Sequence, residues 1–168
     1  MIQAGFVRTM ARYNAWQNRS LYGAASALDD AARDADRGAF FGSIRRTLSH
    51  LLWGDTIWMS RFDGWEAPDV GIPGSSDWIT GWDELSQRRR EADELILDWA
   101  TQVSDAALAG DLTWHSGALG RDVTRPLALC VTHFFNHQTH HRGQVHAMLT
   151  AAGAHPGDTD LFIMPEDL

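Results

Sequence analysis

The chain has 168 residues, a length that fits one domain and buries a core without disulfide bonds. Its formal net charge of −8 disfavours binding to nucleic acid or to an anionic membrane surface. Cys130 is the only cysteine, so no intrachain disulfide can form. The sequence shows no signal peptide and no apolar run near the roughly 18 residues of a membrane span. We therefore expect a cytoplasmic protein with one domain, residues 1–168.

Apolar residues at helical spacing predict three long helices in the first two thirds of the chain. The first covers about residues 6–28. The second covers 43–62, with Ser43 as its N-cap, and is apolar on nearly every side, which is typical of a central helix in a bundle. The third begins near residue 77 or 80 and ends near 101. The charged run 88–91 within it is interpreted as a solvated face.

The remaining segments predict a loop, a short hairpin and a last helix. Glycines and prolines in residues 63–77 indicate a loop. Residues 112–124 have the pattern of a short β-hairpin. A fourth helix follows Pro126 and ends before Gly153. The predicted fold class is all-α, a four-helix bundle with a β-hairpin-like insertion before the last helix.

The last predicted helix carries the most informative pattern of the sequence. Its inward positions are spaced alternately by three and four residues, as in a bundle seam: Leu127, Cys130, Phe134, His137, His141, Gln144 and Met148. Two imidazoles one turn apart in such a seam need a partner, because an unsatisfied buried polar group costs about 1–3 kcal/mol. A metal ion can accept both imidazoles at once.

His50 is the candidate for a third ligand. It lies in the middle of the most apolar helix, and Gly54 leaves room beside it. A lone histidine there would be read as a core residue that is satisfied by a carbonyl or carboxylate, but two further unpartnered histidines favour a shared site. Three imidazoles leave a coordination position for water or substrate, which is typical of a catalytic site. Four residues could line a pocket beside it: Cys130, His133, His140 and Gln144.

Other catalytic signatures do not occur in the sequence. It contains no phosphate-binding loop, no dinucleotide-binding glycine motif and no nucleophile elbow. Asp55 and Glu91 stand as isolated carboxylates without a visible partner, and Cys130 is interpreted as a small buried apolar residue rather than a reactive thiol. No protein nucleophile is therefore predicted.

Three segments together resemble the DinB-like superfamily of damage-inducible four-helix-bundle proteins. They are Tyr13-Asn14-Ala15-Trp16-Gln17-Asn18, then Leu48-Ser49-His50-Leu51-Leu52-Trp53-Gly54-Asp55 with Ile57-Trp58, and finally His137-x-x-x-His141-Arg142-Gly143-Gln144. The end of the chain, Gly153 with Thr159-Asp160-Leu161, also fits this pattern. Each motif is short, but the combination is specific and spans nearly the whole chain.

This resemblance implies an up-down-down-up bundle with a long crossover, a homodimer, and a triple-histidine metal site at His50, His137 and His141. Characterised relatives include S-transferases that use low-molecular-weight thiols and a thiol-dependent maleylpyruvate isomerase. The implied partners are a small-molecule thiol and an electrophile. Three imidazoles suit zinc, nickel, iron or manganese. Two alternatives stay open: a non-catalytic metal-binding stress-response protein and a metal-dependent hydrolase.

Overall fold

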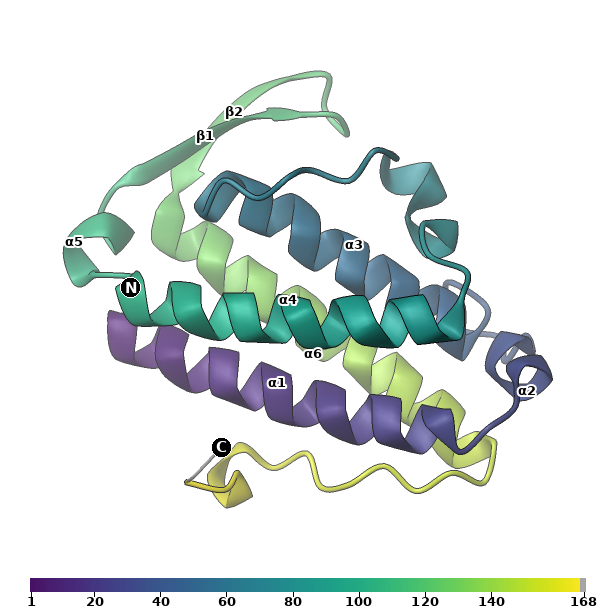
Figure 1. Cartoon of the computed structure of the whole chain (residues 1–168). Coiled ribbons are helices and arrows are strands. Elements are labelled where there is room, and N and C mark those ends of the chain that lie inside the picture. The colour runs from purple at the N-terminus through teal and green to yellow at the C-terminus, as the bar shows by residue number, and fades with distance from the viewer. Residues whose placement is uncertain (167–168) are drawn as a thin grey trace.

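A computed structural model describes residues 1–166 as a bundle built on four long helices (Figure 1). These are α1 (Ala4–Ser26), α3 (Ile44–Phe62), α4 (Trp82–Gln102) and α6 (Leu127–Ala151). Helices α1 and α3 each pack against both α4 and α6. The predicted all-α class is thereby confirmed.

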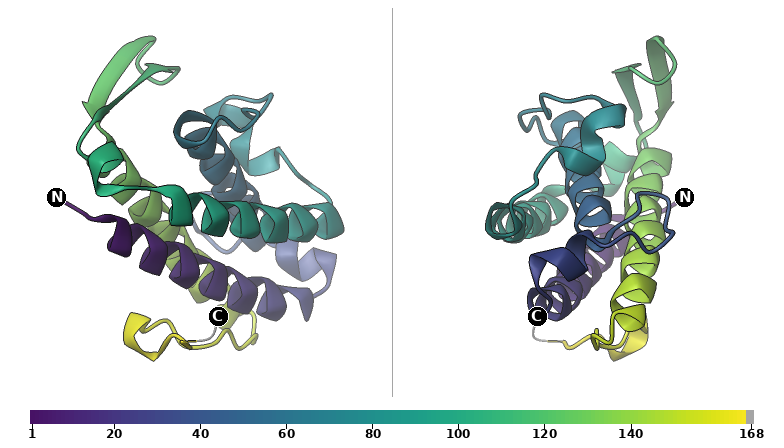
Figure 2. Two further views of the ribbon diagram at one scale, coloured as in Figure 1. Left: turned by 60° about the vertical axis from the view of Figure 1, so that its left-hand side comes forward. Right: turned by 90° about the vertical axis from the view of Figure 1, so that its right-hand side faces the viewer.

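Short elements connect the long helices. They are α2 (Asp30–Asp34), the 3-10 helix η1 (Ile72–Asp77), α5 (Asp105–Leu108) and the 3-10 helix η2 (Leu161–Ile163), and none of them was predicted. The predicted hairpin is confirmed as β1 (Asp111–Ser116) and β2 (Arg121–Pro126), an antiparallel pair that rises from one end of the bundle (Figure 2).

The connection between α3 and α4 runs back along α3 before α4 begins (Figure 1). Its 3-10 helix η1 packs on α3, and the Trp53 indole N–H donates a hydrogen bond of 2.8 Å to the Val70 carbonyl. This return path supports the expected up-down-down-up order, which stays a prediction. No helix within residues 1–166 has the length and apolar character needed to cross a membrane.

Helix boundaries follow the local chemistry of the sequence. The Ser43 hydroxyl accepts a hydrogen bond of 3.2 Å from the Arg46 amide, which confirms the predicted N-cap of α3. Gly153 has a φ of 80°, the left-handed conformation that ends many helices, and it follows Ala152, the C-cap of α6. Helix α4 starts at Trp82, later than predicted, because Gly81 still has an extended backbone with φ −78° and ψ 128°.

The core consists of two apolar clusters separated by a polar layer. One cluster includes Leu48, Leu85 and Leu149, and the other includes Trp99 and Phe134. On each long helix, buried polar residues fall between the positions of the two clusters: Asn14, Asn18, Asp55, Asp93, Gln138 and Arg142. Arg89 extends this layer from α4 and lies between Leu85 and Ala92 of the first cluster.

The polar layer overturns two interpretations made from the sequence. Arg89 is only 3% exposed, so the run 88–91 is not wholly solvated. Asp55 is 1% exposed and is not isolated, since it accepts hydrogen bonds of 2.5 Å from both Arg89 and Gln138. Periodicity of apolar residues cannot reveal such positions, because the residues that fill them are charged.

The predicted seam of α6 proves to be one edge of its buried face, the edge beside α3. The centre of that face is shifted by one residue, along Val131, Phe135, Gln138, Arg142, Val145 and Leu149. His141 is buried, whereas Leu127, His137 and Gln144 are only half-buried. The shift places the histidines of α6 at a border between core and solvent.

Candidate metal centre

Three imidazoles from two helices meet at the border between α3 and α6. The ligand nitrogens of His50, His137 and His141 all lie within 4.8 Å of one another. The Nε2 atoms of His50 and His137 are 3.2 Å apart. Tetrahedral coordination with bonds of about 2.0–2.1 Å separates ligand nitrogens by about 3.3 Å. The structure thus brings together the three predicted histidines in an arrangement that could hold one metal ion.

The spacing of residues on both helices accounts for this convergence. His137 and His141 are four residues apart on α6, and their ring centroids are 4.6 Å apart. Gly54 on α3 faces the His137 ring, and a Cβ there would lie 2.9 Å from its Cε1 atom. The site therefore depends on a glycine one turn after His50.

A hydrogen bond to Ser75 fixes the His50 ring. The His50 Nδ1 lies 2.8 Å from the Ser75 hydroxyl oxygen, and this hydroxyl donates its proton to the Ile72 carbonyl at 2.7 Å. Because the hydroxyl proton is already used, Ser75 accepts from Nδ1–H of His50. The Nε2 lone pair then faces the other two rings, as ligands held by an outer hydrogen bond require.

A hydrogen bond to Gln144 fixes the His141 ring in the same way. Its side-chain oxygen lies 2.9 Å from the His141 Nδ1, and its amide nitrogen lies 3.3 Å from the His140 Nε2. The carbonyl oxygen can only accept, so His141 carries its proton on Nδ1 and leaves Nε2 free. Gln144, predicted as a pocket residue, is thus a hydrogen-bond partner of a candidate ligand.

Burial keeps the three rings neutral. Loss of solvent, together with repulsion from the neighbouring imidazoles, lowers the pKa of His137 to about 3. The same two causes lower the pKa of His50 to about 4. Burial also lowers the pKa of His141, although its bond to Gln144 opposes the shift. At neutral pH the nitrogen lone pairs are therefore available to a metal without prior loss of protons.

Phe41 covers one side of the site. Its ring centroid lies 4.0 Å from that of His50 and 5.4 Å from that of His141. Phe41 belongs to the segment between α2 and α3, and Gly42 directly after it has a φ of 79°. The sequence did not indicate this residue, because nothing in a short irregular segment shows where its side chain points.

The predicted pocket residues fall into different places. His133 is exposed, with its ring 5.9 Å from that of His137, and His140 is exposed, with its ring 4.8 Å from that of His141. Cys130 is buried, and burial raises the pKa of its thiol. This agrees with the interpretation of Cys130 as a small core residue and not a nucleophile.

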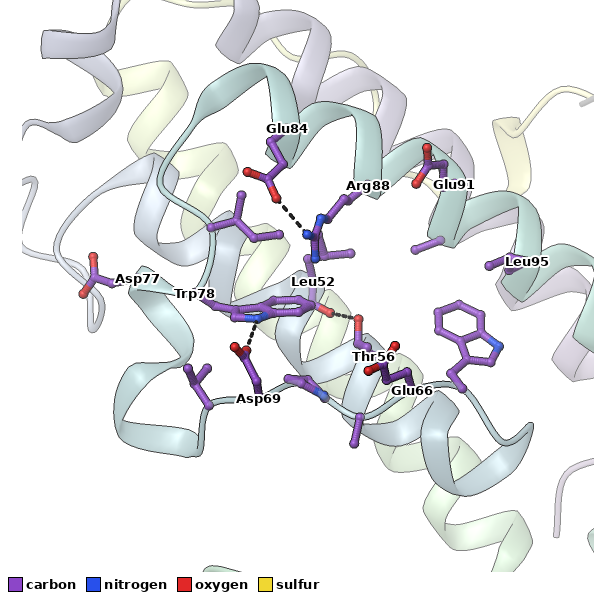
Figure 3. A pocket seen from close by; sticks show the side chains of 16 residues that line it. Leu52, Thr56, Glu66, Asp69, Asp77, Trp78, Glu84, Arg88, Glu91 and Leu95 are labelled. Carbon is purple, nitrogen blue, oxygen red and sulfur yellow. Dashed lines mark hydrogen bonds and ion pairs between the residues drawn. The ribbon is translucent and has the colours of Figure 1, made fainter.

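A cavity of about 590 Å³ lies away from the histidines, between α3, α4 and the returning segment that connects them, residues 63–81 (Figure 3). Several of its polar groups already have partners. The Arg88 guanidinium covers the Trp78 ring at 5.5 Å and pairs with Glu84 at 2.8 Å, and Asp69 accepts from the Trp78 indole N–H. These contacts hold the returning segment against α4, so we assign this cavity a structural role.

Comparisons with known proteins agree with the fold and the motifs. The sequence profile of the DinB family matches residues 1–167. Protein DinB of Bacillus subtilis (strain 168) is 26% identical over 162 residues, which cover 92% of this chain and 91% of that protein. The crystal structure of a DinB-like protein from Bacillus cereus ATCC 10987 has a TM-score of 0.61 at 17% identity, covers 85% of this chain and 90% of that one, and shows a shared fold. The chain therefore belongs to the DinB family.

Proposed function

We propose that this protein is a divalent-metal-dependent S-transferase, or an isomerase of related chemistry, that uses a low-molecular-weight thiol. The convergence of His50, His137 and His141 carries the proposal. Among the described residues, no further histidine, cysteine or carboxylate joins this set. A site with three protein nitrogens leaves a position for an external ligand, whereas structural zinc sites are normally closed by four protein ligands.

A divalent ion held by the three histidines would lower the pKa of a thiol bound to it. The chain's own residues prepare the site: Ser75 and Gln144 orient two of the rings, and Phe41 excludes water from one side. In the transfer, the thiol sulfur forms a bond to an electrophilic carbon, the leaving group departs with its electron pair, and the thiol proton passes to solvent. The protein then needs no nucleophile of its own. Zinc, nickel, iron and manganese all suit such nitrogen donors.

Product formation from a thiol and a fluorogenic or chromogenic electrophile tests the proposal. Metal-loaded protein is incubated with a panel of low-molecular-weight thiols and either monochlorobimane or 1-chloro-2,4-dinitrobenzene. We expect a rate above background for at least one thiol. His137→Ala should abolish this rate, whereas His155→Ala, which changes an exposed histidine outside the site, should retain it.

A background rate with every thiol would contradict the proposal. If, in addition, thiols leave the spectrum of the cobalt-loaded protein unchanged, the ion only braces the bundle. That role predicts a large fall in melting temperature for His137→Ala, whereas the enzyme predicts a modest one. The homodimer that the resemblance implies stays a prediction, which sedimentation equilibrium tests directly.

A further inference from the structure

A half-buried arginine lies beyond the histidine triad on the same face of α3. One side of this helix carries four residues at spacings of four, four and three: His50, Gly54, Trp58 and Arg61. Gly54 and Arg61 are seven residues apart, about 10 Å along the axis at 1.5 Å per residue. Helical side chains lean toward the N-terminus, so Arg61 extends back toward the triad.

Aromatic rings form a continuous row from the triad to Arg61. The ring of His133 lies 5.9 Å from that of His137, and the ring of Trp58 lies 5.3 Å from that of His133. The Arg61 guanidinium lies over Trp58 at 4.6 Å and over Trp114 of β1 at 5.4 Å. These stacking contacts hold the guanidinium plane in place and leave its N–H edges for an acceptor.

Within residues 1–166 Arg61 pairs with no carboxylate, unlike several other sheltered arginines. Arg33 pairs with Asp30 at 2.7 Å and Arg45 pairs with Asp34 at 2.5 Å. Burial lowers the pKa of Arg61, and no carboxylate in the described part of the chain offsets this cost. A half-buried cation without an anion is costly to keep, and an anionic ligand would remove that cost.

A second arginine adds positive charge near Arg61 although the whole chain is acidic. Arg61 and Arg125 of β2 both act electrostatically on the Cys130 thiol and counter the rise of its pKa that burial causes. On the other side of the triad, Phe41 stacks on His50 and closes the approach. The row of rings on the side of the triad away from Phe41 therefore leads toward Arg61.

We propose that Arg61 binds a carboxylate of the thiol cosubstrate while the sulfur of that thiol lies at the histidine triad. This inference rests on the function proposed above and adds the chemical class of the cosubstrate, an extended thiol with a terminal carboxylate. A guanidinium can bind a carboxylate through two parallel N–H donors while its faces remain on the indoles. Arg61 would then select among thiols and position the sulfur.

Two thiols that differ only at the far end test this role. The probes are 8-mercaptooctanoate and 8-mercapto-1-octanol, whose extended chains are close to the separation between Gly54 and Arg61. Their affinities for the cobalt-loaded protein are measured from the sulfur-to-cobalt charge-transfer absorption. We expect the carboxylate to bind about tenfold more tightly than the alcohol, because a charge-assisted bond is made only by the former.

Arg61→Gln should reduce the affinity for the carboxylate to that for the alcohol and leave cobalt affinity unchanged. Arg90→Gln, on the exposed side of α4, is the matched control and should keep the preference. Equal affinities in the wild type, or a preference that survives Arg61→Gln, would overturn the inference and leave the thiol-dependent function intact. The wild-type comparison decides this even if the variant folds poorly. If neither thiol produces the absorption band, the proposed function itself fails, and the role of Arg61 fails with it.

Discussion

Gly54 of α3 provides the space that the His137 ring of α6 fills. A Cβ at position 54 would lie 2.9 Å from Cε1 and 3.4 Å from Nδ1 of that ring, whereas carbon atoms in favourable contact are about 3.5–4.0 Å apart. Glycine inside a helix is less stable than alanine by about 1 kcal/mol. Gly54 thus lowers the stability of α3, and it leaves space for the His137 imidazole next to the other two rings.

We predict that Gly54→Ala weakens zinc binding by at least about tenfold, the size of effect expected when a ligand loses its support. The added methyl group displaces the half-buried His137 ring, which can turn toward solvent while the helix stays intact. Competition with a chromophoric chelator measures the affinity, and circular dichroism checks the helix content.

Gly143→Ala is the matched control for this prediction. Gly143 also lies inside a long helix, close to His141, but a Cβ there meets nothing within 4 Å. This variant should bind zinc as the wild type does and gain up to about 1 kcal/mol of stability. An equal loss of affinity in both variants would show that helix composition, and not the contact with His137, controls binding.

Ser75→Ala should also weaken zinc binding, by about 10–100-fold. Without the hydroxyl, Nδ1–H of His50 loses its acceptor, and the ring can rotate or change tautomer. Isothermal titration with zinc measures the loss. Ser76→Ala removes a neighbouring hydroxyl that bonds to Asp77 and to no ligand histidine, so zinc affinity should stay at the wild-type value. If Ser75→Ala retains full affinity, the serine does not orient the ligand.

The ligand histidines could be predicted because they interrupt apolar patterns. His50 lies among leucines, and His137 and His141 occupy one edge of the buried face of α6. Ser75 and Phe41 could not be predicted, since both come from short connecting segments with no periodicity. Their positions follow from how those segments pack on α3, which only the folded chain shows.

The buried polar layer was missed for a different reason. The buried stripe on α4 consists of Leu85, Ala92, Ile96 and Trp99. Arg89 fills the gap between Leu85 and Ala92 at the expected helical spacing. A charged residue in such a gap is usually interpreted as exposed, because charges are almost never fully buried unless paired. Asp93 pairs with it at 2.9 Å from the next turn of α4, but Asp55 lies on α3, and the sequence of α4 alone gives no evidence of that second partner.

Removal of the Asp55 carboxylate should destabilise the protein strongly. Asp55→Ala leaves Arg89 buried with one carboxylate fewer and deprives Gln138 of its acceptor. Breaking a buried ion pair from one side costs about 3–5 kcal/mol, which urea unfolding at pH 7 measures. Glu84→Ala removes an exposed pair with Arg88 and should cost less than about 1 kcal/mol. Similar losses in the two variants would mean that Asp55 does not hold the layer together.

The metal-free protein should lose stability as the pH falls below about 6.5. His50 and His137 have folded-state pKa values of about 4 and about 3, below the unfolded value of 6.5. Between those values the unfolded chain binds more protons than the folded chain, so acidification favours unfolding. Their contribution is complete above pH 6.5 and declines as the pH approaches the folded-state values. Urea midpoints measured from pH 7 to pH 4 follow this decline.

A double variant, His50→Gln with His137→Gln, separates this effect from all other titrations. Buried acids such as Asp93 are present in both proteins, so the difference between the two pH profiles isolates the two imidazoles. We expect the variant to be as stable as or more stable than the metal-free wild type at pH 4, with a flatter profile. Parallel profiles would mean that the two rings titrate normally and are not held neutral at the site. In that case protons would compete with the metal near neutral pH, and zinc affinity would fall already below about pH 7.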